Sequence, residues 1–138
     1  MVKKKDLYTS EFTKVNLASE QNLKDGFAEF FDGGIDEEFK GRYKLAATAY
    51  FKAITQICDL IISRKRGYAP SSHTERFRIL ENEFPQIYLS VDSIFKTYQD
   101  TYSIPITKDS CAAIKNEIRN IINHGKLDKE FKEALSKL

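Results

Sequence analysis

The sequence predicts an all-α protein made of one domain, on the strength of three observations. Apolar residues recur at helical spacing along most of the 138 residues, whereas the alternation typical of half-buried strands is hard to find. Glycine and proline, which interrupt helices, number only six and three. Four principal helices joined by short connectors favour an up-down-up-down four-helix bundle, with a short extra helix at the C-terminus.

The N-terminal residues 1–18 are polar with scattered apolar positions, and we assign them to an N-terminal arm. Ser19 is a suitable N-cap for a first helix that reaches about Phe31, because its hydroxyl can accept a hydrogen bond from a free N–H group of the first turn. Gly33-Gly34 is expected to end this helix. The helical bundle is therefore predicted over residues 19–125.

A second helix is predicted from about Glu37 to Arg66, and it is apolar over so much of its circumference that it should contact several neighbours. It ends in Arg64-Lys65-Arg66-Gly67, with cations in the last turn followed by a glycine. Its longest apolar run, residues 58–62, is interrupted by Asp59 and is far shorter than the ~20 residues of a membrane span. We therefore expect no membrane partner.

Two further helices are predicted after a loop at Pro70. Ser72-His73-Thr74-Glu75 fits the Ser-x-x-Glu capping box that begins many helices. Pro85 cannot continue the hydrogen-bond ladder, so it should kink or restart the third helix, whose apolar pattern continues to about residue 102. A fourth helix is expected over about 107–124, ending at Gly125, and residues 126–138 form a short amphipathic helix.

Composition excludes several classes of protein. Lys and Arg number 22 against 20 Asp and Glu, a net charge of +2 that excludes a histone-like polycation. Two cysteines, Cys58 and Cys111, make no disulfide framework and are expected to be small buried hydrophobes. Two Cys and two His are too few for a zinc site, and we expect no metal or cofactor. No apolar stretch follows the basic start, so we expect no signal peptide and a cytoplasmic location.

The fourth helix has two contrasting faces. An apolar stripe of about 100° should face the bundle; it comprises Cys111, Ile114, Ile118, Ile121 and Ile122. The opposite face carries Asn116, Arg119, Asn120, Asn123 and His124 with Ala112 and Ala113. Asn is a poor helix former, so this composition indicates a face that meets another molecule closely, with amides as donors and acceptors. A merely tolerated polar face is the alternative.

Arg119 and His124 lie about 140° apart around the helix axis, so they flank the Asn face without stacking on each other. Asn120 is one turn before His124 and could orient its imidazole. Symmetric pairing of this face in a homodimer would bring two arginines and two histidines around one cleft. The structural alternatives are a histidine that complements the helix dipole and an exposed cation at Arg119.

The segment from Arg119 to His124 reads R-N-x-x-x-H, which resembles the motif of the HEPN domain family. The resemblance covers roughly residues 20–125, including the segment 43–61 and the loop 67–73, which look like the family's long second helix and the loop after it. It implies a dimeric bundle of four or five helices. Many members are metal-independent endoribonucleases, some of them toxins paired with a minimal nucleotidyltransferase, while others are inactive and bind nucleotides or partners.

One departure and one rival match bear on this resemblance. Toxins silenced by a nucleotidyltransferase commonly carry a Tyr two residues after the motif His, where this chain has Lys126, which weakens the toxin–antitoxin interpretation. Arg66 and His73 also match the motif with a longer gap, but that pair spans a glycine and a proline in a loop. Asp100, in a polar patch where the family often places cleft-side residues, is a weaker candidate.

The chemistry follows from these residue types. An RNA 2′-OH can attack its own phosphate, and a histidine supplies both protonation states near neutral pH. Arg119 is therefore expected to hold the phosphate and His124 to act as acid or base, while Asn116, Asn120, Asn123 and Asp100 bind substrate. We expect a metal-independent endoribonuclease that works as a homodimer. The alternative is a non-catalytic dimer that binds a nucleotidyltransferase or a nucleotide.

Overall fold

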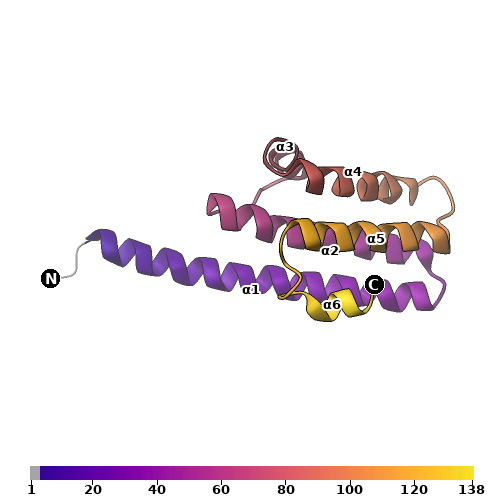
Figure 1. Cartoon of the computed structure of the whole chain (residues 1–138), viewed down its shortest axis with the longest axis horizontal. Helices are drawn as coiled ribbons and strands as arrows, with labels where there is room; N and C mark the ends of the chain where they lie inside the picture. Colours follow the sequence, from indigo (N-terminus) through magenta and orange to yellow (C-terminus); the bar gives the residue numbers. More distant parts are fainter. Residues whose placement is uncertain (1–3) are drawn as a thin grey trace.

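The computed structural model describes the backbone of residues 4–138 and the side chains from Ser19 onward. This part of the chain is all-helical, as predicted, and contains no strand. Its helices are α1 (Lys4–Phe39), α2 (Tyr43–Arg66), α3 (His73–Glu83), α4 (Pro85–Asp100), α5 (Lys108–His124) and α6 (Lys132–Ser136). Figure 1 shows α2 in the middle of the molecule, with α1 along one side and α4 along the opposite side. Helix α5 lies beside α2. The short α6 lies against α1.

The first helix differs from the prediction at both ends. It continues through residues 4–18, so Ser19 is not its N-cap, and residues 1–3 of the predicted arm lie outside the described residues. It also continues through Gly33-Gly34. Gly34 is buried, and a Cβ atom there would lie 2.4 Å from Cε1 of Tyr50. These glycines therefore do not end the helix, and Gly34 lets α1 approach α2 closely.

The turn between α1 and α2 lies at residues 40–42, later than predicted. Gly41 has a φ of +76°, a conformation that favours glycine, and its N–H donates to the carbonyl of Glu38 at 2.9 Å. The second helix therefore begins at Tyr43 and not near Glu37. It ends at Arg66, where Gly67 adopts the expected left-handed conformation, with a φ of 86°.

Helix α2 forms the centre of the core and contacts α1, α3, α4 and α5, as its broad apolar surface predicted. Its large buried side chains include Tyr50, Ile54, Ile57 and Leu60. One 18-residue window of the helix does reach the hydropathy of a membrane span, although its unbroken apolar run is short. Since 67% of that apolar window is buried inside the bundle, the role of a core helix accounts for its composition.

The predictions for the next two helices are confirmed. The Ser72 hydroxyl accepts the N–H of Glu75 at 3.1 Å and caps α3, while the Glu75 carboxylate accepts from both the N–H and the hydroxyl of Ser71. Pro85 restarts the helix, because α3 ends at Glu83 and Pro85 is the first residue of α4. Helix α4 packs against both α2 and α5.

Gly125 ends α5 as predicted, although it does not adopt the left-handed conformation that is common for a glycine at a helix end. Its φ is −77°, and the left-handed residue is Lys126, with a φ of 57°. A Cβ atom at Gly125 would lie 2.8 Å from Cδ1 of Ile61, so the glycine is needed for close packing against α2. The chain then turns back toward α1, where Phe131 packs edge-on against Phe27 with ring centroids 5.0 Å apart.

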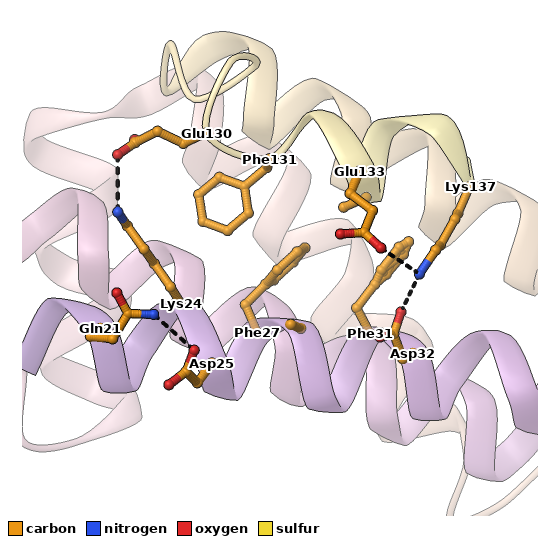
Figure 2. A pocket seen from close by; sticks show the side chains of 12 residues that line it. Gln21, Lys24, Asp25, Phe27, Phe31, Asp32, Glu130, Phe131, Glu133 and Lys137 are labelled. Atoms are coloured by element: carbon orange, nitrogen blue, oxygen red, sulfur yellow. Dashed lines mark hydrogen bonds and ion pairs between the residues drawn. The ribbon is translucent and has the colours of Figure 1, made fainter.

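Ion pairs fasten the C-terminal segment to α1 at both ends (Figure 2). Glu130 pairs with Lys24 at 3.2 Å, and Lys137 pairs with Asp32 at 2.9 Å. Between these pairs lies a pocket of about 350 Å³, and Phe27 of α1 and Phe131 are among its lining residues. Residues 126–138 thus cover α1, and the predicted C-terminal helix is shortened to Lys132–Ser136.

Candidate functional site on helix α5

The inner face of α5 is the predicted apolar stripe. Its buried residues are Cys111, Ile114, Ile118, Ile121 and Ile122, and every one of them is no more than 2% exposed. The hydroxyl of Thr107 accepts the N–H of Ser110 at 3.2 Å and caps the helix. Because this face is fixed in the core, the opposite face is held rigidly toward solvent.

The outer face is open in the single chain. Its exposed residues are Ala112, Ala113, Asn116, Asn123 and His124, while Arg119 and Asn120 are half-buried at its edges. No apolar side chain larger than alanine stands on it. We call these seven residues the α5 face, and two copies of its alanine end could approach each other closely without steric conflict.

The guanidinium of Arg119 has spare hydrogen-bonding capacity. One of its terminal nitrogens donates to Oδ1 of Asn116 at 3.0 Å. Among the residues whose side chains the structure describes, no carboxylate lies within 4 Å of it. Since a guanidinium carries five N–H donors, the remaining ones can grip a phosphate in a bidentate fork.

His124 is the last residue of α5 and is exposed. Its ring makes no hydrogen bond within residues 19–138, so the predicted orienting contact from Asn120 is not formed in the single chain. The helical position also keeps it on the opposite edge of the α5 face from Arg119, about 140° away. A single chain therefore supplies the residue types for phosphate binding and proton transfer without assembling them.

Asp100 is not brought to this part of the molecule. It is the exposed last residue of α4, and the connector 101–107 joins it directly to the start of α5. The 17 residues of α5 span about 25 Å, and His124 is at the far end. Any contact between Asp100 and a substrate held by His124 would require a ligand of that length.

A second group of polar residues, which the sequence analysis did not single out, lies between α2 and α3. Arg76 is 8% exposed and binds buried Asp59 through two hydrogen bonds of 2.6 and 2.9 Å. A third nitrogen of Arg76 donates to Nδ1 of His73 at 2.6 Å. Partial burial, and then the charge of Arg76, lower the pKa of His73. This group joins two helices, and Asp59 in an apolar run was its only sequence signal.

A third group links α1, α2 and α5. The hydroxyl of Tyr50 donates to Oε1 of Glu38 at 2.7 Å, and the ammonium of Lys115 donates to Oε2 of the same carboxylate at 3.0 Å. Burial, followed by this hydrogen bond, raises the pKa of Tyr50. These contacts link the middle of α5 to the end of α1.

The two cysteines are buried and free, as predicted. Burial raises the pKa of Cys58, and it raises the pKa of Cys111 to about 11, so both thiols are protonated at neutral pH and suited to packing. No group of three or more His, Cys, Asp or Glu side chains within residues 19–138 is arranged to hold a metal ion.

Comparison of the chain with protein-family models, curated proteins and solved structures gives no match. The functional argument therefore rests on the chain's own residues. The α5 face combines a guanidinium with free donors, an exposed imidazole and three amides, and this set can bind a phosphodiester and move protons around it.

Proposed function

We propose that this protein is a metal-independent endoribonuclease of the HEPN type, active as a homodimer formed through the α5 face. The observation that carries the proposal is the placement of Arg119 and His124. Both belong to the R-N-x-x-x-H motif, and both lie on the open face of a helix whose other face is buried. Their side chains are accessible to a substrate, while the backbone that carries them is rigid.

Two features support a dimer. The exposed Ala112 and Ala113 allow a second copy of α5 to come near, and the Asn side chains can pair across a two-fold axis. Arg119 and His124 occupy opposite edges of the face, so a partner is needed to complete a site. Two-fold pairing places the partner's His124 and the partner's Arg119 around the same cleft.

The proposed reaction uses the nucleophile that RNA itself carries. His124 of one protomer accepts the proton of a 2′-OH, whose oxygen attacks the adjacent phosphorus. The bond from phosphorus to the 5′-oxygen breaks, and the partner's His124 donates a proton to that oxygen. The products are a 2′,3′-cyclic phosphate and a 5′-OH, and Arg119 stabilises the charge on the phosphorane.

The test is cleavage of a structured RNA by pure protein in EDTA, with the ends of the products identified. We expect wild-type protein to leave 2′,3′-cyclic phosphate ends, and His124→Ala and Arg119→Ala to be at least about 100-fold slower. Arg78→Ala, which removes an exposed arginine of α3, is the matched control and should cleave normally. Equal cleavage by His124→Ala would contradict the proposal.

Mixing wild type with His124→Ala tests the shared cleft. If each dimer needs both histidines, activity after subunit exchange falls with the square of the wild-type fraction; a linear fall would show that each histidine works independently of the other. Absence of cleavage by the wild type, together with a stable nucleotidyltransferase or nucleotide complex, would favour the non-catalytic alternative.

A further inference from the structure

A basic pocket lies beside the α5 face, where the end of α1 meets the start of α5. Its volume is about 330 Å³, within the range of small-molecule sites. It is lined by Ile35, Glu38, Phe39, Tyr43, Lys108, Lys115 and Lys137. We call it the flank pocket. Three of these residues are lysines, but Lys115 pairs with Glu38 and Lys137 pairs with Asp32, so the excess positive charge is that of Lys108.

The single carboxylate of the flank pocket is already neutralised. Glu38 binds Lys115 through one oxygen and accepts the hydroxyl proton of Tyr50 through the other. Lys137 pairs with Asp32 at 2.9 Å at the edge of the pocket. Lys108 has no carboxylate within 4 Å among the described side chains, so its charge is available to an anion.

An aromatic ring forms part of the same pocket. Phe39, the last residue of α1, is 91% exposed, the most exposed large apolar side chain within residues 19–138. An exposed Phe side chain does not gain the favourable free energy of burial. No described side chain covers the ring of Phe39. Every kind of nucleobase can stack on an exposed aromatic ring, because every base has a π-face.

The flank pocket is continuous with the α5 face. Lys108, Lys115 and Arg119 lie within about 40° of one another around the axis of α5 and are spaced by about 10 and 6 Å along it. They make a line of cations from the pocket to the arginine proposed to hold the scissile phosphate. A line of positive charge beside an exposed ring is the usual arrangement for single-stranded nucleic acid.

We propose that the flank pocket is a nucleotide subsite for single-stranded RNA, with a phosphate held by Lys108 and a base stacked on Phe39. The subsite rests on the proposed function, because the nucleotide belongs to the strand that crosses the α5 face. It adds a determinant of substrate choice: the enzyme selects RNA with at least one unpaired nucleotide next to the cleavage site.

The experiment measures binding of a fluorescent single-stranded RNA in EDTA, in a His124→Ala background that keeps the RNA intact. We expect Phe39→Ala to weaken binding about ten-fold, the loss of one stacked base. Lys108→Gln should weaken binding several-fold and reduce the salt dependence by about one counterion. Leu89→Ala and Lys96→Gln, which change an exposed apolar residue and an exposed lysine of α4, are the controls and should bind normally.

Two results would overturn the subsite: unchanged binding by both Phe39→Ala and Lys108→Gln, or an equal loss in the two controls. Adenosine monophosphate, titrated by calorimetry, gives a second readout, and its binding should weaken in both pocket variants. If RNA binds with this dependence and is never cleaved, the subsite stands and the nuclease proposal fails. If RNA is cleaved through His124 but Phe39→Ala and Lys108→Gln both cleave and bind normally, the subsite alone fails.

Discussion

Two arginine–histidine pairs in this chain lie in opposite environments. Arg76 of α3 is 8% exposed and binds both Asp59 and His73, the exposed first residue of that helix. Arg119 and His124 stand on the outer side of α5, where Arg119 binds only the side chain of Asn116 among described residues and His124 is exposed. Arg76 is held by two protein partners, whereas Arg119 has one and His124 has none among the described side chains.

The difference shows that environment, and not residue type, separates a structural pair from a candidate site. A buried arginine must be matched by a carboxylate because an unpaired charge in the interior is costly, and Asp59 provides that match. Arg119 is partly exposed to solvent and needs no carboxylate partner, so most of its N–H donors can bind a ligand. Substitutions at these residues, and at others that bear on the proposed dimer and on the fold, test this contrast.

Arg76→Leu should reduce the free energy of unfolding by about 3–5 kcal/mol, because it leaves the carboxylate of Asp59 buried and unpaired. Arg119→Leu removes the same group from the α5 face and should change the free energy of unfolding by less than about 1 kcal/mol. Urea denaturation of both variants makes the measurement. Similar losses in the two would mean that Arg119 is as structural as Arg76.

Ala112→Glu should break the proposed dimer without unfolding the chain. Two glutamates facing each other across a two-fold axis repel by several kcal/mol, whereas an exposed glutamate is well tolerated on a monomeric helix. Sedimentation would then show a monomer, with the helical content of the wild type. Leu89→Glu on α4 is the matched control, and a dimer that survives Ala112→Glu would place the interface elsewhere.

The stability of the fold should fall as the pH drops below 7, through His73. Its folded-state pKa is lowered, so the unfolded chain takes up the proton more readily, and the stabilisation present above the ordinary value of 6.5 is lost as the pH falls through the folded-state pKa. His73→Asn keeps an acceptor for Arg76 and should flatten this dependence. An unchanged pH profile in that variant would assign the effect to another group.

The smallest effect concerns Arg64, an arginine intermediate between the two cases. Its guanidinium binds Glu130 and Glu20, and it lowers the pKa of Glu130 to about 2. Because the pair is solvent-accessible, Glu130→Gln should cost less than about 1 kcal/mol. The wild type should lose that increment as the pH falls from about 4.5 toward 2, and a larger loss would mean that residues 126–138 are held mainly by charge.

Most local features of the fold could be predicted from the sequence, although Ser19 was wrongly assigned as an N-cap, and the features that depend on neighbouring helices could not. The caps at Ser72 and Thr107, the restart at Pro85 and the apolar stripe of α5 are set by residues within one turn of helix. The prediction that Gly34 helps to end the first helix was wrong, because Gly34 makes room for Tyr50, which is 16 residues further along the chain.

The candidate site shows the same division. The sequence indicated which residues stand on the outer face of α5, because helical geometry alone decides that. It did not indicate that Lys108, Lys115 and Phe39 line one pocket, since these residues come from two helices that are brought together by packing against α2. The pairing of Asp59 with Arg76 was hidden for the same reason.

We propose that Arg119 and His124 perform chemistry, whereas Arg76 and His73 support the fold. The most direct test measures both RNA cleavage in EDTA and the free energy of unfolding for His124→Ala and His73→Ala beside the wild type. We expect His124→Ala to abolish cleavage at unchanged stability, and His73→Ala to lower stability while cleavage per folded molecule persists. Cleavage that survives His124→Ala and is lost with His73→Ala in folded protein would contradict it.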